Sequence, residues 1–378
     1  MPGFPKLKTT LLPSLSAYNK EGIIMAAQKI NVGVIGFGMS SKTFHCPLIV
    51  SSPHLVLHSI VSSNDSCTKV YPQAKHVATT ADLFASKDVQ LVVITTPNEL
   101  HFPLAKQAME AGKNVVVEKP FTVTSQEAAE LVEISKRTGL VCSIYQNRRW
   151  DGDLLTAKKI IENEQLGRLV EFESHFDRFR NFVKAGWREQ DVPGSGMLYD
   201  LGAHLIDQAL YLFGKPYSVY GVVENQRQLK DSNIDDDFTI IFRYKTGLKV
   251  LLRSSMLARQ TPVLRFSLRG MDGSYIKHYL DPQEDQLKAG QTPKNAGYGV
   301  EPESQWGTIN TEVNGIHVVG KVETLSGKYL DFYNNVAETI LKGDLNHLAV
   351  KPEHGYDTIR MIEVIRQSSD EGGKTIVL

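Results

Sequence analysis

The sequence is poor in cysteine, has no net charge and contains no long apolar run, and each of these absences excludes a class of protein. Its three cysteines (Cys46, Cys67 and Cys142) lie far apart in a chain of 378 residues, which argues against a disulfide framework or a zinc ribbon. Basic and acidic residues balance at 42 each, so no net field favours nucleic acid or a membrane surface. No apolar stretch approaches the ~18 residues of a membrane span. We therefore expect a globular protein of a reducing, cytoplasmic compartment, long enough for two separate cores.

The first 28 residues differ in composition from the rest of the chain. They contain three lysines and no arginine, whereas a mitochondrial presequence would be rich in arginine, so mitochondrial targeting is the weaker interpretation. Three prolines disfavour one continuous helix in this segment, and Met25 offers a second start position just before the first strand. We expect residues 1–28 to form a disordered extension, residues 29–148 a first domain and residues 149–378 a second.

The pattern at the start of the first domain is strand, glycine turn and helix. Gly36, Phe37 and Gly38 directly follow a strand-like run at 29–35, and a turn this tight lets backbone N–H groups meet a pyrophosphate. Ser41 replaces the third glycine of the usual fingerprint and is small enough for close packing. Strand-like runs recur at 55–61, 90–95, 114–118 and 140–145, with helical patterns at 99–112 and 124–138. This alternation predicts an α/β fold with a doubly wound, Rossmann-like parallel sheet.

Two further strand ends supply the expected cofactor contacts. Ser62 and Ser63 follow strand 55–61, and no acid stands where an NAD enzyme would use one to bind the ribose 2′-hydroxyl. Hydroxyl groups bond a 2′-phosphate without repelling its charge, so we expect NADP rather than NAD, although the same residues also suit an ordinary turn. Pro97 begins the next turn, where Asn98 could reach a ribose hydroxyl or the nicotinamide.

Lys119 stands at the end of a strand that we expect to be buried. Three valines precede Glu118, as in the middle of a parallel sheet, and Pro120 prevents the strand from continuing. Ligands of open α/β sheets lie outside the carboxyl ends of the strands, so the Lys119 ammonium is aimed at the expected site. A lysine at a strand end can equally be a surface side chain, and on its own Lys119 does not decide between the two.

The periodicity changes after residue 150. A helical pattern at 153–164 precedes closely spaced alternating runs, which predict a C-terminal α+β domain with a large, open, mostly antiparallel sheet at 169–180, 217–225, 237–245, 248–257 and 264–269. The second face of such a sheet needs a cover, and a second subunit is an economical one, so we expect a homo-oligomer. Residues 328–342 and 354–369 are typical of helices, whereas 283–312 predicts a long surface loop.

An apolar helix follows a Gly-Ser-Gly turn at 194–196. Asp200 and His204 are four residues apart and share one helix face, with Asp207 one turn later. A carboxylate and an imidazole so placed can converge on one substrate hydroxyl, and a histidine with an ordinary pKa of ~6.5 suits a general base for an alcohol. One helix face rarely completes a metal shell, so we expect no metal, and a structural helix with internal polar bonds is the remaining alternative.

Three motifs, Gly36-Phe37-Gly38, Glu118-Lys119-Pro120 and the segment 194–204, together resemble the glucose–fructose oxidoreductase/inositol dehydrogenase (Gfo/Idh/MocA) family over about residues 29–378. The runs 41–47, 146–151 and 173–180 look like the branch that contains NADP-dependent scyllo-inositol dehydrogenases. The resemblance implies a Rossmann domain, a substrate-binding and dimerisation domain, and hydride transfer at a secondary alcohol of a cyclitol or sugar. It also implies a cis peptide between Lys119 and Pro120.

The resemblance further implies roles for single residues. Lys119, Asp200 and His204 correspond to the catalytic set of the family. The expected cofactor contacts are Gly36, Phe37, Gly38, Ser41, Ser62, Ser63, Pro97, Asn98, Glu118 and Lys119. The candidates for the substrate side are Arg149, Trp150, His175, Asp177, Trp187 and Arg188. A non-catalytic NADP-binding sensor or co-regulator of the same fold is the alternative, and the joint presence of the three catalytic residues argues against it.

Overall fold

The computed structural model describes residues 29–184, 186, 189–229 and 232–378. Its first part is a six-stranded sheet in the order β3-β2-β1-β4-β5-β6, in which every neighbouring pair is parallel. The strands are β1 (Ile30–Ile35), β2 (Leu55–Val61), β3 (Lys75–Val77), β4 (Leu91–Ile94), β5 (Asn114–Val117) and β6 (Cys142–Ile144). The chain winds outward from β1 to β3 and then outward again from β4 to β6. This order confirms the predicted doubly wound, Rossmann-like sheet.

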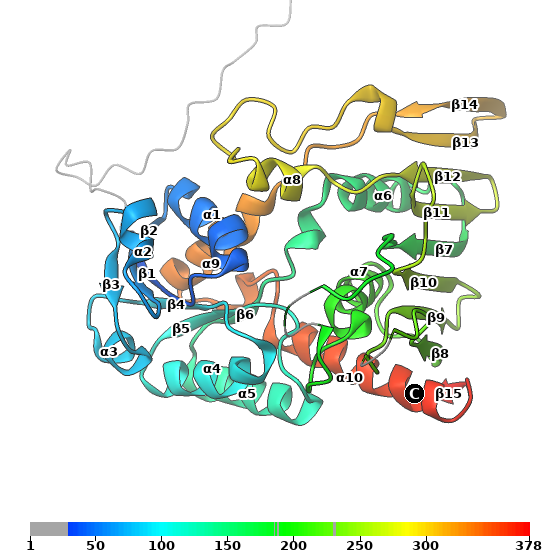
Figure 1. The fold of residues 1–378 in the computed structure, drawn as a ribbon. Helices are drawn as coiled ribbons and strands as arrows, with labels where there is room; N and C mark the ends of the chain where they lie inside the picture. Colours follow the sequence, from blue (N-terminus) through cyan, green and yellow to red (C-terminus); the bar gives the residue numbers. More distant parts are fainter. Residues whose placement is uncertain (1–28, 185, 187–188, 230–231) are drawn as a thin grey trace, which may run out of the picture.

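Helices cover both faces of this sheet (Figure 1). On one side lie α1 (Cys46–Ser51) and α9 (Tyr329–Lys342), and on the other lie α4 (His101–Glu110) and α5 (Ser125–Thr138). Helix α5 begins with the predicted capping box, in which the Thr124 hydroxyl and the Glu127 carboxylate each accept a backbone N–H of the other residue. The short helices here are η1 (Ser41–His45), α2 (Ser66–Val70), α3 (Thr80–Ala85) and η2 (Asn98–Leu100).

The second part is a nine-stranded sheet in the order β14-β13-β12-β11-β7-β10-β9-β8-β15. Its neighbours are antiparallel except for β7 and β10, so the prediction of a mostly antiparallel sheet is confirmed. The strands are β7 (Leu169–His175), β8 (Ser218–Glu224), β9 (Asp237–Arg243), β10 (Lys249–Ser255), β11 (Leu264–Gly270), β12 (Gly273–His278), β13 (Gly307–Val313), β14 (Ile316–Val322) and β15 (Ile376–Val377).

The prediction of a long surface loop over 283–312 is wrong. This segment contains helix α8 (Gln283–Lys288), the short helix η6 (Glu303–Gln305) and the whole of β13. Side chains of β13 alternate between buried and exposed, with Ile309 and Thr311 facing inward. Most of the Gly, Pro and Asn residues that suggested a loop lie between α8 and η6, and Gly307 and Asn310 lie in β13 itself. This composition concealed a strand with the ordinary alternation of buried and exposed side chains.

Helices α6 (Gly152–Glu162), α7 (Ala203–Phe213) and α10 (Pro352–Asp370) lie between the nine-stranded sheet and the rest of the molecule (Figure 1). Within the part of the chain that the structure describes, no helix covers the opposite face of this sheet. The C-terminal helices also reach the first part, because α10 packs against α5 and α9 packs against α1. The remaining short helices are η3 (Asn147–Trp150), η5 (Leu198–Gly202) and η7 (Leu345–His347).

Candidate active site

A cavity of about 630 Å³ opens at the carboxyl ends of the parallel strands and brings the two parts of the chain together. Its wall includes the turn after β1, the end of β5, helices η5 and α7, the extension of β7 and helix α8. The side chains that line the cavity include Ser40, Glu118, Lys119, Arg148, Phe176, Arg178, Arg180, Asp200, His204 and Glu284. All three predicted catalytic residues therefore line one cavity.

Lys119 points from the end of β5 toward the start of η5. Its Nζ donates to Asp200 Oδ1 at 2.8 Å and to the Asp200 backbone oxygen at 2.9 Å. The two side chains are 13% and 24% exposed, so the pair is partly screened from water. The peptide between Lys119 and Pro120 is cis, as the family resemblance implied. Asp200 lies in a π-helical turn, an arrangement that is frequent at functional sites.

Glu118 lies beneath Lys119 and binds structural partners. Its carboxylate accepts the backbone N–H of Lys119 at 2.8 Å, the Ser40 hydroxyl, and a hydrogen bond from His45 at 2.9 Å. Burial alone would raise the pKa of Glu118, but the hydrogen bond and charge of His45 and the charge of Lys119 lower it to about 2. His45 also contacts the Tyr333 hydroxyl on α9. Glu118 is thus an ionised anchor for the lysine backbone.

His204 is buried on the first turn of α7 and stacks against Phe176, with ring centroids 6.4 Å apart. Burial lowers the pKa of His204 well below 6.5, and the positive charges of Lys119, Arg148 and other cations lower it further. Its Nδ1 is buried without a hydrogen-bond partner among the described residues. His204 is therefore a neutral imidazole whose Nε2 is the nitrogen left to meet a ligand in the cavity.

Asp207 does not join Asp200 and His204. Its two carboxylate oxygens accept bonds of 2.7 and 2.8 Å from the Arg149 guanidinium, and both side chains are buried. This bidentate pair holds η3 to α7 away from the cavity. Among the described residues, no group of three histidine, cysteine, aspartate or glutamate side chains could hold a metal ion.

The structure places four of the predicted substrate-side residues outside the cavity. Arg149 is held by Asp207, and Trp150 packs edge-on against Phe332. His175 bonds Asp177 at 2.8 Å and Glu173 at 2.9 Å on the opposite face of the nine-stranded sheet. Their neighbours Arg148, Phe176 and Arg178 line the cavity in their place. The other two candidates, Trp187 and Arg188, lie outside the described residues.

The glycine turn fits a dinucleotide pyrophosphate. Gly36 has a φ of +94°, and a Cβ there would approach the Thr95 hydroxyl to 2.9 Å, so a side chain is excluded. Apart from its chain neighbours, no atom of the described residues lies within 4 Å of the position of a Cβ on Gly38, which leaves space for a phosphate to reach the backbone. The buried Ser41 hydroxyl donates to the Gly38 oxygen and fixes the turn on the first residues of η1. Phe37 flanks the turn and is half-buried against Tyr71.

The other predicted cofactor contacts lie at neighbouring strand ends. The Ser62 hydroxyl donates to the backbone oxygen of Asn64, and Ser63 is exposed. Pro97 is exposed, whereas Asn98 is buried and donates to the Gly194 oxygen at 2.5 Å. Asn98 thus joins the first sheet to the loop before η5, a contact that the sequence alone did not suggest.

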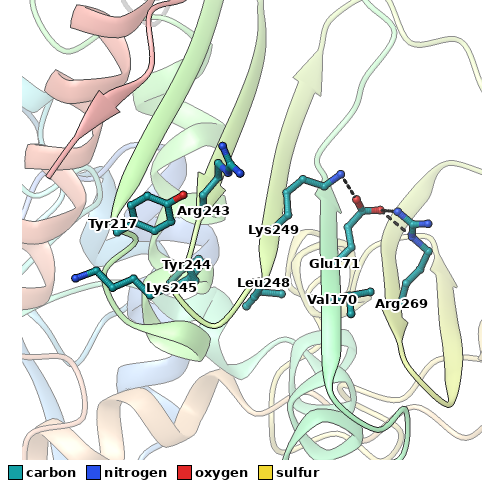
Figure 2. Close-up of a pocket in the computed structure, with 10 residues that line it drawn as sticks. Val170, Glu171, Tyr217, Arg243, Tyr244, Lys245, Leu248, Lys249 and Arg269 are labelled. Atoms are coloured by element: carbon teal, nitrogen blue, oxygen red, sulfur yellow. Dashed lines mark hydrogen bonds and ion pairs between the residues drawn. The ribbon is translucent and has the colours of Figure 1, made fainter.

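A second cavity, of about 650 Å³, lies at the uncovered side of the nine-stranded sheet (Figure 2). Its wall includes Glu171, Arg243, Lys249 and Arg269, and Glu171 pairs with both Lys249 and Arg269. Lys249 and Arg269 thus neutralise the charge of Glu171. None of the predicted catalytic residues is among the residues that line this second cavity. This cavity has no groups arranged for the chemistry of the first one.

The cysteines and the hydropathy of the helices are relevant to two expectations from the sequence. Cys46, Cys67 and Cys142 are all buried free thiols. A search of the described residues finds no helix that is both long enough and apolar enough to cross a bilayer.

Comparison with protein families identifies the class of protein. Residues 30–146 match the family described as "Oxidoreductase family, NAD-binding Rossmann fold", and residues 158–377 match "Oxidoreductase family, C-terminal alpha/beta domain". The chain belongs to the Gfo/Idh/MocA oxidoreductase family, which confirms the resemblance carried by its motifs.

Individual relatives span almost the whole chain. The chain is 41% identical over 346 residues to the uncharacterized oxidoreductase YdgJ of Escherichia coli, a match covering 90% of this chain and 95% of YdgJ. It is 34% identical over 350 residues to scyllo-inositol 2-dehydrogenase (NADP(+)) IolW of Bacillus subtilis, covering 92% and 96%. The solved structure of the putative oxidoreductase yvaA from Bacillus subtilis superimposes with a TM-score of 0.88 at 34% identity, covering 93% of this chain and 99% of the other.

Proposed function

We propose that the protein is an NADP-dependent oxidoreductase that transfers hydride between nicotinamide and a secondary alcohol of a cyclitol or sugar, as a scyllo-inositol dehydrogenase does. One observation carries the proposal: Lys119, Asp200 and His204 line a single cavity at the carboxyl edge of a nucleotide-binding sheet. The relative IolW is named as an NADP-dependent scyllo-inositol 2-dehydrogenase. A more distant relative, 24% identical over 297 residues and covering 69% of this chain and 76% of its own length, is the levoglucosan dehydrogenase of Pseudarthrobacter phenanthrenivorans.

The proposed chemistry follows from the charge states of the three residues. His204, which is neutral because of its lowered pKa, accepts the proton of the substrate hydroxyl. The Lys119 ammonium stabilises the negative charge that develops on the substrate oxygen, and the Asp200 carboxylate holds that ammonium in place. NADP bound at the Gly36–Gly38 turn would accept the hydride on its nicotinamide ring. In the reverse direction His204 returns the proton to the carbonyl oxygen.

The preference for NADP rests on the end of β2. Ser62 and Ser63 follow the strand, and the first carboxylate, Asp65, stands three residues after Ser62 at the start of α2. An acid at the end of β2 would repel a 2′-phosphate, whereas hydroxyl groups can donate to it. Lys69 on α2 is exposed and adds positive charge near this turn.

A substrate panel tests the proposal directly. Purified protein is mixed with NADP⁺ and a panel of inositols, hexoses and pentoses, and the absorbance of the reduced cofactor is followed. We expect turnover on at least one cyclic polyol and none in the absence of cofactor. Cofactor binding without turnover on any member, in either direction, would overturn the proposal in favour of a non-catalytic sensor.

The proposal also covers the oligomeric state of the protein and its cellular compartment. We propose that a second subunit covers the open face of the nine-stranded sheet, where Tyr220, Ile241 and Leu251 form one row across β8, β9 and β10. The three free thiols are consistent with a cytoplasmic protein. We also propose that the first domain ends at residue 148 and the second begins at residue 149. Helix α9 of the second domain packs against α1 of the first.

A further inference from the structure

The ring of Phe176, at the wall of the cavity, contacts three guanidinium groups, and those of Arg148 and Arg178 line the cavity as well. Their Cζ atoms lie 4.7 Å (Arg148), 5.3 Å (Arg178) and 6.0 Å (Arg265) from the ring centroid, within the range of a cation–π contact. Phe176 is buried, and its backbone N–H donates to the Arg253 oxygen at 3.1 Å. The buried Phe176 ring therefore makes cation–π contacts with three arginine side chains.

Two of these three cations have their own carboxylates. Arg148 pairs with Glu284 and with Asp151, and Arg265 pairs with Asp153 at 3.0 Å. Arg178 differs from both, because within the described part of the chain its guanidinium has no ion pair and no hydrogen bond. Its backbone is nevertheless fixed, since its N–H donates to the Ser255 oxygen at 2.9 Å. The Arg178 guanidinium thus lies over the Phe176 ring, in the cavity that also contains the predicted catalytic groups.

Most of the carboxylates that share the cavity with Arg178 are already bound to other cations, and Asp281, whose pKa burial raises to about 7, bonds Gly152 and Gln283 instead. Glu189 pairs with Arg180 at 2.8 Å and Arg227 at 3.0 Å, Glu284 pairs with Arg148 and Lys288, and Asp200 pairs with Lys119. The pKa of Arg178 is lowered, first by burial and then by the charges of Arg148 and Arg180, with Asp200 and Glu284 opposing. An arginine nevertheless remains charged in a protein, so Arg178 is a partly buried positive charge that forms no ion pair with any described carboxylate.

We propose that Arg178 binds an acidic substituent, a carboxylate, on the sugar or cyclitol that the site oxidises or reduces. A guanidinium binds a carboxylate through two parallel hydrogen bonds. The ligand carboxylate would therefore form the ion pair that no described residue forms with Arg178. One free guanidinium balances one negative charge, so a carboxylate fits better than a dianionic phosphate beside Glu284 and Asp285. Lys184 also lines the cavity, but it is exposed to solvent. This inference rests on the proposed function and narrows its substrate class to sugar acids.

Matched pairs of a neutral sugar and its acid test the proposal. We compare kcat/KM for glucose with glucuronate and for galactose with galacturonate, using the wild type, Arg178→Gln and Arg178→Lys. We expect the wild type to prefer at least one acid at least tenfold over its neutral counterpart. Arg178→Gln should abolish that preference, because it lowers kcat/KM for the acid at least tenfold more than kcat/KM for the neutral counterpart, and Arg178→Lys should retain part of the preference. Arg137→Gln, the same change on the exposed end of α5, is the matched control and should leave the preference unchanged.

Two results would overturn the proposal and leave the proposed function standing. One is a wild type that turns over neutral polyols and rejects the acids; the other is an Arg178→Gln variant that loses activity on both members of a pair equally. If no compound is turned over, calorimetric titration of glucuronate and glucose into the protein with NADP⁺ still decides the matter. Tighter binding of glucuronate that Arg178→Gln removes supports the proposal, and equal or absent binding of the two sugars refutes it.

Discussion

The Lys119 ammonium lies 2.8 Å from the Asp200 carboxylate, although the two residues are 81 positions apart in the sequence. The same ammonium also reaches the Asp200 backbone oxygen, so two bonds fix its direction toward the π-helical turn η5. The Lys119 backbone is fixed from the other side by the Glu118 carboxylate, which His45 and Ser40 hold. The lysine is therefore held at both ends of its chain before any ligand arrives, as electrostatic stabilisation of a transition state requires.

Removal of the Lys119 charge should abolish most of the activity. We expect Lys119→Met to lower kcat on the best polyol by about 10²–10³-fold, because one preorganised stabilising group typically contributes that much. Binding of NADPH, measured by fluorescence titration, should weaken far less than kcat falls, since the glycine turn proposed to bind the pyrophosphate remains intact. Lys136→Met, the same change at an exposed site on α5, is the control. Turnover of Lys119→Met equal to that of the wild type would refute the proposed role.

The pH profile should report a histidine with a lowered pKa. His204 stays neutral as the pH falls through 6.5, so the acidic limb of kcat/KM for alcohol oxidation should lie well below pH 6.5. Burial raises the pKa of Asp281, which also lines the cavity, to about 7, so the profile is measured in Asp281→Asn as well. His204→Gln should lower kcat by about 10²–10⁴-fold. An acidic limb at or above pH 6.5 that persists in Asp281→Asn would contradict a neutral His204.

Glu118 should contribute stability that depends on pH. Its folded pKa of about 2 is below the ordinary 4.5, so the unfolded chain binds a proton first as the pH falls. The stabilisation is complete above pH 4.5 and is lost as the pH falls from 4.5 toward 2. We expect Glu118→Gln to lower the free energy of unfolding by about 1–3 kcal/mol at pH 7, the usual cost of losing a charged hydrogen bond.

Urea denaturation at pH 7 and pH 3.5 measures this difference. The gap between wild type and Glu118→Gln should shrink at the lower pH, whereas the exposed control Glu130→Gln should differ from wild type by less than about 1 kcal/mol throughout. A gap of the same size at both values would mean that Glu118 acts through its shape and not through its charge.

Most of the fold could be predicted from the sequence because its signals are local. The valines before Glu118, the glycine turn after β1 and the capping box at Thr124 each specify their own element. Strand β13 could not be predicted, because the Gly and Pro residues around it indicate a loop. Its alternation became clear only in the structure, where Ile309 and Thr311 face inward.

Two of the residues predicted for the substrate side, His175 and Asp177, do not line the cavity for a physical reason that concerns β7 and its extension. His175 at the end of β7 and Asp177 just after it alternate with the side chains that face the core. The cavity continues from the core side of the sheet, so Phe176 and Arg178 line it, and the polar alternates form ion pairs on the other face. His45 was also missed, although it lies in the run 41–47 that resembles the scyllo-inositol dehydrogenase branch.

The end of β2 should decide the choice of cofactor. We expect the wild type to bind NADPH more tightly than NADH, and Ser62→Asp to weaken NADPH at least tenfold, because a carboxylate there repels the 2′-phosphate. The matched control is Ser304→Asp, at an exposed position on η6. Equilibrium titration of nicotinamide fluorescence measures both constants. Tighter binding of NADH by the wild type would refute the inference from Ser62 and Ser63.

The open face of the nine-stranded sheet should be buried in an oligomer. Leu251 on β10 stands beside Ile241, which stands beside Tyr220, and these three half-buried side chains face away from the helices that cover the other side. A row of apolar side chains across three strands is an expected subunit contact. Light scattering coupled to size-exclusion chromatography should give at least a dimer for the wild type and a smaller species for Leu251→Asp. Leu341→Asp, the same change at an exposed site on α9, should leave the mass unchanged, and a monomeric wild type would exclude this interface.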